Sequence, residues 1–189
     1  MGTGESNDDV PRYDLSGLSV LFLEQHAPMR NLMRAVLREL GVKKVSAAST
    51  PEEAYRMFTK EPVDLVLTDW APTLDGMAFL KQVRTAVDSP DPFVPVIVVT
   101  AHTELGRVYN ARDLGMTEFL AKPISAKLLY GRIRAVIENK RPFVRSDGFF
   151  GPDRRRKRGP FNGDNKRQDG DEAARSAASD LPAAATRSS

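Results

Sequence analysis

Four polar residues end or follow short apolar stretches of the sequence, and together they could bind a phosphoryl group. They are the carboxylates Glu24 and Asp69, the hydroxyl of Thr100 and the ammonium of Lys122. Phosphoryl transfer to a carboxylate needs an attacking oxygen held in line and cations that neutralise the phosphoryl oxygens. Lysine supplies one cation, and Mg²⁺, which prefers carboxylate oxygens, supplies another. These residues have the chemistry of a phosphoacceptor site if the fold brings them together.

Five apolar stretches alternate with five segments of helical periodicity, and these elements would position the four residues. The expected strands are 18–23, 43–48, 63–69, 94–101 and 117–123, and the expected helices are 28–41, 50–58, 76–87, 104–115 and 125–140. Strands that are apolar on both faces are typical of a parallel sheet covered by helices on either side. Residues 17–139 are therefore predicted to form one doubly wound α/β domain with a five-stranded parallel sheet. Ligands of such sheets bind at the carboxyl ends of the strands, where the four residues stand.

The helical segments also predict caps and buried faces. Thr50 and Ser125 stand at expected N-caps, because a side-chain hydroxyl there can accept from a free backbone N–H. Apolar residues three and four positions apart predict the faces that turn inward. These faces include Leu32 in the first helix, Val87 in the third and Leu128 in the last.

Three motifs together resemble the receiver domain of bacterial response regulators, the CheY family. They are DLVLTDW…LDGMAFLKQVR, PVIVVTA and EFLAKP, and the resemblance covers the predicted domain. It implies the strand order 2-1-3-4-5, with Asp69 as phosphoacceptor and Phe119 as the aromatic switch residue. It also implies that the Thr100 hydroxyl moves toward the phosphoryl group and that the Lys122 ammonium pairs with it. It also implies a cis peptide before Pro123, a signalling role rather than an enzyme activity, and a histidine kinase as phosphoryl donor.

The same resemblance implies a Mg²⁺ site at Glu24 and Asp69, and the sequence departs from the family there. Gln25 stands where the family has a second acid, and an amide oxygen is a weaker Mg²⁺ ligand than a carboxylate. The loop DWAPTLDG is one residue shorter than usual, which affects the backbone carbonyl near Ala71 that would bind the metal. We expect a degraded metal site and a less efficient phosphorelay. The alternative is that Thr100 and Lys122 serve only as hydrogen-bond partners of Asp69.

The composition changes after Lys140. The chain has 189 residues and a net charge of +3, but residues 140–167 contain ten Lys or Arg against three Asp. This stretch has little apolar periodicity and is expected to be disordered when free. We divide the chain into a disordered leader (1–16), the receiver-like domain (17–139), an arginine-rich ligand-binding arm (140–168) and a disordered tail (169–189).

Arginine dominates the first basic cluster, which favours a nucleotide ligand over a simple electrostatic tether. Arginine forms bidentate contacts with phosphate and guanine and stacks on base planes. The candidate ligand-binding residues are Asp153, Arg154, Arg155, Arg156 and Arg158, with Trp70 as a candidate stacking partner. The stretch RPFVRSDGFFGPDRRRKR is similar to the extension of alphaproteobacterial CheY-like cyclic-di-GMP effectors. That resemblance implies cyclic-di-GMP as ligand and the flagellar motor, or other motility or attachment machinery, as the regulated partner.

Two alternatives stay open for the chain as a whole. It could be a conventional response regulator phosphorylated on Asp69 by a histidine kinase, or the arm could bind nucleic acid or anionic surfaces without specificity, with a steep salt dependence. In either case the family's partner surface lies on the fourth helix, fifth strand and fifth helix, near Tyr109, Phe119 and Tyr130.

Several classes of protein are not expected. The sequence has no cysteine, and no catalytic triad, P-loop or dinucleotide-binding motif, so we expect no enzyme and no zinc site. No apolar stretch is long enough to span a bilayer, and the start of the chain does not resemble a signal peptide. We expect a cytoplasmic protein without a DNA-binding domain.

Overall fold

The computed structural model describes residues 13–71, 73–101, 104–146 and 149–153. These residues form the predicted α/β domain, with five parallel strands in the order β2-β1-β3-β4-β5, and so confirm the predicted fold class and strand order. A two-stranded antiparallel hairpin, β6-β7, follows the domain. No helix in these ranges is long and apolar enough to cross a membrane.

The elements agree with the predicted ones to within a few residues at each end. The strands of the sheet are β1 (Ser19–Leu23), β2 (Lys44–Ala48), β3 (Leu65–Asp69), β4 (Val96–Thr100) and β5 (Glu118–Ala121). The helices are α1 (Ala27–Glu39), α2 (Pro51–Lys60), α3 (Gly76–Thr85), α4 (Leu105–Asp113) and α5 (Ala126–Glu138). Thr50 and Ser125 are N-caps as predicted, and each accepts a hydrogen bond from a backbone N–H three residues on.

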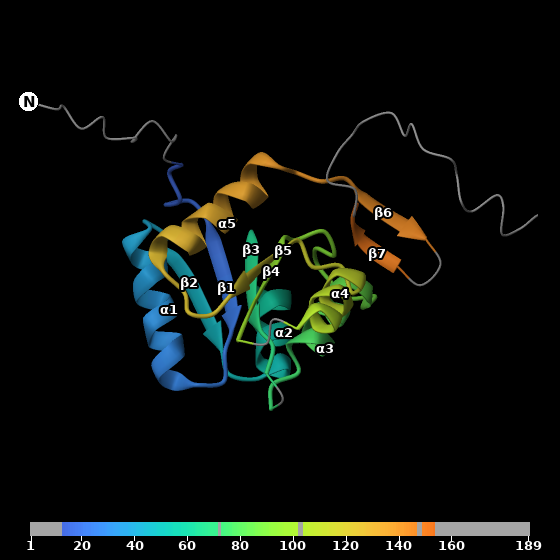
Figure 1. The fold of residues 1–189 in the computed structure, drawn as a ribbon, viewed down its shortest axis with the longest axis horizontal. Coiled ribbons are helices and arrows are strands. Elements are labelled where there is room, and N and C mark those ends of the chain that lie inside the picture. Colours follow the sequence, from blue (N-terminus) through green and yellow to red (C-terminus); the bar gives the residue numbers. More distant parts are fainter. Residues whose placement is uncertain (1–12, 72, 102–103, 147–148, 154–189) are drawn as a thin grey trace, which may run out of the picture. The chain divides into compact units, whose positions relative to one another are not determined.

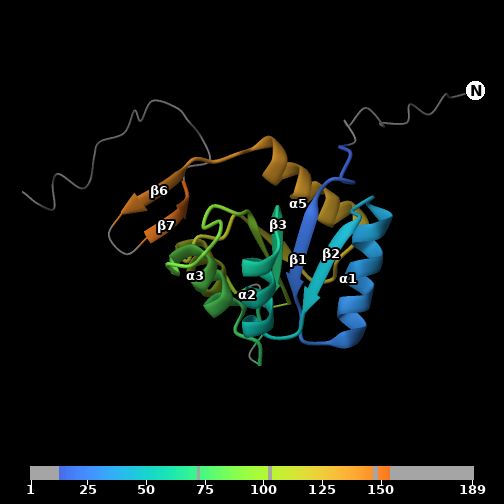
Figure 2. The same ribbon diagram turned by 180° about the vertical axis from the view of Figure 1, so that it is seen from behind.

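The helices cover both faces of the sheet, which explains why the central strands are apolar throughout. Helices α1 and α5 pack on one face, and α2, α3 and α4 on the other (Figures 1 and 2). Every residue of β3 and β4 is buried. The core therefore consists of two apolar layers, one on each side of the sheet.

Three apolar residues predicted to face inward are exposed. Leu32 and Leu128 lie at the margins of the apolar stripes of α1 and α5, with 51% and 53% of their surface accessible. Val87 is fully exposed because α3 ends at Thr85, so that the helical periodicity no longer applies at Val87. The buried positions of α1 are Met33 and Leu37, which lie on a narrower stripe than the sequence pattern predicted.

The start of the described chain is more ordered than the predicted leader. Leu15 is buried in the core between the sheet, α1 and α5. The backbone N–H of Tyr13 donates to the Tyr130 hydroxyl at 2.8 Å, and the Tyr13 hydroxyl donates to Glu138 at 3.1 Å. The ordered domain therefore begins by residue 13 rather than at residue 17.

The expectation of disorder directly after Lys140 is wrong for the first part of the arm. Strands β6 (Phe143–Ser146) and β7 (Phe149–Pro152) form the hairpin that follows α5. The rings of Phe143 and Phe150 pack against each other and against Phe93, with centroids 5.2 to 5.5 Å apart. These aromatic contacts bury part of the hairpin against the domain and offset the entropy of ordering it. The later part of the arm and the tail lie outside the described residues.

Glycine permits a close contact between the hairpin and the turn between α4 and β5. Gly115 has a φ of +92°, which favours glycine, and a Cβ there would lie 2.6 Å from the carbonyl oxygen of Phe150. A Cβ on Gly151 would lie 2.6 Å from the Cα of Gly115. The two backbones can therefore touch only because both residues lack a side chain.

Candidate functional site

The structure brings Glu24, Asp69 and Lys122 together at the carboxyl ends of β1, β3 and β5. The Lys122 ammonium donates to Glu24 Oε2 at 2.8 Å and to Asp69 Oδ2 at 2.9 Å. Both carboxylate side chains are nearly inaccessible to water, with 5% and 6% of their surface exposed. One ammonium thus neutralises one of two buried negative charges. The peptide between Lys122 and Pro123 is cis, as the family resemblance implies.

Backbone contacts fix the positions of the two carboxylates. Glu24 Oε1 accepts from the backbone N–H of His26 at 2.8 Å and lies 3.0 Å from the His26 ring. Arg30 donates to the carbonyls of Glu24 and Gln25 and so holds the β1–α1 loop. Gly76 packs directly under Asp69, because a Cβ on Gly76 would lie 1.9 Å from the Asp69 carbonyl oxygen.

The shared lysine sets the ionisation of the site. Burial would raise the pKa of Glu24, but hydrogen bonds from Lys122 and the His26 backbone outweigh it and lower that pKa below its ordinary value. Burial raises the pKa of Asp69, and the lysine only partly compensates. Burial would lower the pKa of Lys122, but its two carboxylate partners raise it. The lysine therefore favours the ionised form of both carboxylates, and it does so more effectively at Glu24 than at Asp69.

Thr100 and Trp70 lie beside Asp69. The Thr100 hydroxyl, which is fully buried, donates to the Trp70 carbonyl at 2.6 Å. The guanidinium of Arg107 covers one face of the Trp70 ring, 5.0 Å from its centroid. The Thr100 hydroxyl thus holds the residue that follows Asp69, and the candidate stacking ring is already packed against the core and covered by Arg107.

The donor set around Asp69 fits Mg²⁺ in part. The carboxylates of Glu24 and Asp69 are hard oxygen ligands, and Mg²⁺ in proteins commonly uses one or two carboxylates together with water. The Gln25 amide donates to the Thr73 hydroxyl at 2.6 Å, and the Ala71 carbonyl accepts from the Leu74 N–H at 3.0 Å. In the described residues no three acidic, His or Cys side chains gather as a metal cluster. These residues fit an ion held by two carboxylates and water.

The other predicted residues lie apart from the carboxylates. Phe119, on β5, is half-buried against the core layer beneath α2, α3 and α4. Tyr109, on α4, has half of its surface exposed, and Tyr130 accepts the hydrogen bond from Tyr13. Asp153 follows β7, where its N–H donates to the Pro142 carbonyl at 2.8 Å. The predicted ligand residues Arg154, Arg155, Arg156 and Arg158 lie outside the described residues.

Sequence analysis missed the buried Arg84 of α3. Its Nε donates to the Gly115 carbonyl at 3.0 Å, its Nη1 donates to the Pro92 carbonyl, and its guanidinium lies 5.2 Å from the centre of the Phe143 ring. Burial lowers the pKa of Arg84 to about 10. The sequence does carry a signal for this burial. Arg84 follows Val83 on the apolar face of the helix, where a solvent-exposed arginine is not expected.

The carboxylates and the lysine lie where the receiver fold places its site, and the sequence comparison agrees with this geometry. Residues 20–134 match the family described as "Response regulator receiver domain". The chain belongs to this family. Receiver domains are CheY-like modules of two-component signalling and are not an enzyme family.

Relatives of this receiver include chemotaxis proteins. It is 31% identical over 120 residues to "Probable chemotaxis protein CheY" of Rhizobium etli, an alignment that covers 63% of this chain and 92% of that protein. It is 27% identical over 122 residues to chemotaxis protein CheY-3 of Vibrio cholerae, covering 64% and 92% of the two chains. Both alignments cover under two thirds of this chain.

Solved receiver structures have the same fold. The receiver domain of the sensor histidine kinase PA1611 from Pseudomonas aeruginosa is 27% identical, with a TM-score of 0.57 over 65% of this chain and 99% of that one. That structure holds a magnesium ion in its active-site cleft. A receiver domain from Clostridium thermocellum is 28% identical, with a TM-score of 0.57 over 65% and 96% of the two chains.

Proposed function

We propose that this protein is a receiver whose Asp69 accepts a phosphoryl group from a histidine kinase. The observation that carries the proposal is the Lys122 ammonium, which lies within 3 Å of both Asp69 and Glu24. A phosphoryl group on Asp69 would add negative charge beside this lysine. The lysine could then exchange its contact with Asp69 for one with the phosphoryl oxygens.

The transfer itself needs little from the protein beyond position and charge. A carboxylate oxygen of Asp69 forms the new P–O bond as the P–N bond to the donor histidine breaks, and the donor imidazole keeps the electron pair. Burial raises the pKa of Asp69, and Lys122 opposes this shift by favouring the charged form that makes the attack. Thr100 lies one strand away and can donate to the phosphoryl group if its hydroxyl leaves the Trp70 carbonyl.

Mg²⁺ would be held by Glu24 and Asp69, and when bound it would neutralise charge on the phosphoryl oxygens. Gln25 adds no charge to this site. We therefore infer weaker Mg²⁺ binding and slower phosphorylation than a site with three acids would give.

We propose that the signal leaves through the surface formed by α4, β5 and α5, which would bind a component of motility or attachment machinery. Leu105 and Tyr109 on α4 and Leu128 on α5 are large apolar residues with half or more of their surface exposed. Such residues are suited to a protein interface. The similarity to chemotaxis proteins supports a motility partner such as the flagellar motor.

Beryllofluoride, which mimics an acyl phosphate, tests the site directly. Trp70 is the only tryptophan of the chain and follows Asp69, so its fluorescence reports on the site. We expect a fluorescence change with beryllofluoride that requires Mg²⁺ and is absent in Asp69→Asn. A change that persists in Asp69→Asn, or no change at millimolar Mg²⁺, would count against the proposal.

A second candidate function is cyclic-di-GMP binding through Asp153, Arg154, Arg155, Arg156 and Arg158. Its support is the arginine-rich composition and the anchoring of the residue before the cluster. Asp153 is bound to the Pro142 carbonyl, and Arg141 lies 3.4 Å from the Asp153 carbonyl. The arginine cluster thus starts from a fixed point on the receiver, which lowers the entropy cost of binding.

Calorimetry with cyclic-di-GMP at low and high salt would test this second function, with GMP and GTP as controls. We expect micromolar or tighter binding, about −8 kcal/mol, which survives salt and is lost in the Arg154→Ala/Arg158→Ala variant. Binding that falls steeply with salt and does not distinguish the nucleotides would instead indicate a non-specific anionic tether.

A further inference from the structure

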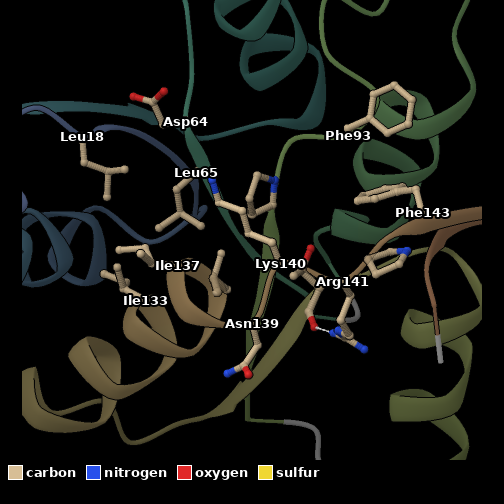
Figure 3. Close-up of a pocket in the computed structure, with 14 residues that line it drawn as sticks. Leu18, Asp64, Leu65, Phe93, Ile133, Ile137, Asn139, Lys140, Arg141 and Phe143 are labelled. Atoms are coloured by element: carbon tan, nitrogen blue, oxygen red, sulfur yellow. Dashed lines mark hydrogen bonds between the residues drawn. The ribbon is translucent and has the colours of Figure 1, made fainter. Parts of the chain in front are cut away.

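A cavity of about 460 Å³ lies at the amino ends of the strands, at the opposite edge of the sheet from Asp69. It is formed where β1, β3, β4 and β5 begin, beside the end of α5 and the hairpin (Figure 3). Its volume is in the range of small-molecule sites, about 300 to 1,000 Å³. No residue of the candidate phosphoacceptor site lines it.

The walls of this cavity are mostly apolar. One wall consists of Leu65 at the start of β3 and Ile133 and Ile137 on α5. The opposite wall contains Phe93 and Phe143, whose rings pack edge to face. The cavity can therefore take a compact apolar group between aliphatic and aromatic side chains.

Three charged side chains line the cavity, and two of them have partners. Asp64 accepts from the Ser19 N–H at 2.8 Å. Arg141 donates to the Thr117 carbonyl and lies 3.8 Å from Glu118. Lys140 makes no ion pair with any described residue, and Figure 3 shows its side chain in the middle of the lining residues. The cavity thus holds one ammonium without a carboxylate partner.

We propose that this cavity binds a small amphipathic anion, with its apolar body between α5 and the Phe93–Phe143 pair and its anionic group on Lys140. The class of ligand is a carboxylate or sulfonate that carries an aromatic or medium-length aliphatic body. Lys140 is an exposed side chain at the rim of the cavity, and an anion there would gain a charge-assisted hydrogen bond while its apolar body lies among the aliphatic and aromatic walls.

The cavity exists because of the extension that follows the receiver. Lys140, Arg141, Phe143 and Pro152 line it and lie beyond residue 134, where the family match ends. A bound ligand would contact both the receiver core and the hairpin. It would therefore stabilise the hairpin in its docked position, since a ligand that binds only the docked state favours that state. The arginine cluster begins two residues after Pro152. A bound ligand would therefore also hold in place the end of the hairpin from which the cluster starts.

The test uses 1-anilinonaphthalene-8-sulfonate, a fluorescent amphipathic anion, and N-phenyl-1-naphthylamine, its uncharged counterpart. We expect saturable binding of the sulfonate to the full-length protein and displacement by decanoate. Lys140→Gln should weaken sulfonate binding about tenfold, the loss of one charged hydrogen bond, and leave the neutral dye unaffected. Lys81→Gln, an exposed lysine of α3 away from the cavity, is the matched control and should change neither.

Ile137→Trp tests the apolar half of the site by filling it. We expect this variant to lose both dyes while thermal unfolding shows that it remains folded. If it does not fold, the two lysine variants and decanoate displacement still decide the question. The proposal is overturned if the sulfonate does not bind, if decanoate does not displace it, or if Lys140→Gln and Lys81→Gln behave alike. It is also overturned if the protein sediments with phosphatidylglycerol vesicles but does not bind free decanoate, since the ligand source would then be a membrane.

Discussion

At the residue scale, the site around Asp69 depends on one lysine shared by two buried carboxylates. Lys122 contacts both Glu24 and Asp69, yet their pKa values move in opposite directions. Glu24 has additional donors in His26, whereas burial dominates at Asp69. Burial therefore disfavours the ionised form of Asp69, and a cation bound beside the carboxylate would favour it.

We expect Asp69→Asn to raise the free energy of unfolding at neutral pH. A carboxyl whose pKa is higher in the folded than in the unfolded protein binds its proton more tightly when folded. Its ionised form therefore costs stability above the folded pKa, and this cost disappears as the pH falls below the ordinary value of 3.8. Urea unfolding of both proteins between pH 7 and pH 3.5 should show a difference that shrinks toward acid. A variant less stable than the wild type at pH 7 would contradict the expected increase in the free energy of unfolding.

We expect Gln25→Asp to tighten Mg²⁺ binding roughly tenfold, because ligand charge sets the affinity of carboxylate sites for hard cations. The measurement is a Mg²⁺ titration followed by Trp70 fluorescence. Thr73→Ala is the control, since it removes the hydrogen-bond partner of the Gln25 amide without adding a charge. Equal Mg²⁺ affinities in Gln25→Asp and the wild type would show that residue 25 does not limit the metal site.

The sequence predicted which residues meet at this edge of the sheet but not how they pair. A parallel sheet brings the carboxyl ends of β1, β3 and β5 together, so the proximity of Glu24, Asp69 and Lys122 followed from the alternation of elements. The contacts of Trp70 with Arg107 and of Gln25 with Thr73 depend on loop conformations. No periodic pattern encodes such conformations, so sequence analysis could not find them.

At the element scale, the hairpin β6-β7 is the main departure from a plain receiver. Its strands are only four residues long, and an isolated hairpin of this size is marginal in water. Its stability therefore comes from the contacts of Phe143 and Phe150 with Phe93 and from the approach of Gly151 to Gly115. These partners lie far apart in the sequence, and for this reason the composition of the segment wrongly indicated disorder.

Substitution by alanine at two different glycines should change the stability of the protein in opposite directions. Gly151→Ala places a methyl group 2.6 Å from the Gly115 backbone and should destabilise hairpin docking by about 1 to 3 kcal/mol. Gly131→Ala, in α5 with open space around it, should stabilise the protein by up to about 1 kcal/mol, because alanine favours the helix. Hydrogen exchange of the hairpin amides and urea unfolding measure the two effects. Unchanged hairpin protection in Gly151→Ala would show that the glycine contact is not needed.

At the scale of the whole molecule, the described chain carries two separate sites. The carboxylates and Lys122 occupy the carboxyl ends of the strands, and the apolar cavity lies at their amino ends. The hairpin packs against the turn between α4 and β5, which belongs to the proposed output surface. A conformational change at β5 could therefore affect both the proposed partner surface and the hairpin, whose end precedes the arginine cluster.

Truncations should separate the hairpin from the rest of the arm. A chain that ends at Asp153 keeps every described contact of the hairpin, so we expect the free energy of unfolding to equal that of the full chain within about 0.5 kcal/mol. A chain that ends at Asn139 loses Phe143 and Phe150 and leaves Phe93 and Leu65 more exposed, so it should be less stable. Equal stability of the two truncated chains would mean that the hairpin contributes nothing to the fold.

The most direct test of the central claim is covalent phosphorylation of Asp69. The protein is incubated with acetyl phosphate and Mg²⁺, and its intact mass is measured beside that of Asp69→Asn and Lys122→Ala. The proposed site predicts one added phosphoryl group on the wild type, none on Asp69→Asn and slower addition to Lys122→Ala. No phosphorylation of the wild type, or equal phosphorylation of Asp69→Asn, would contradict the account.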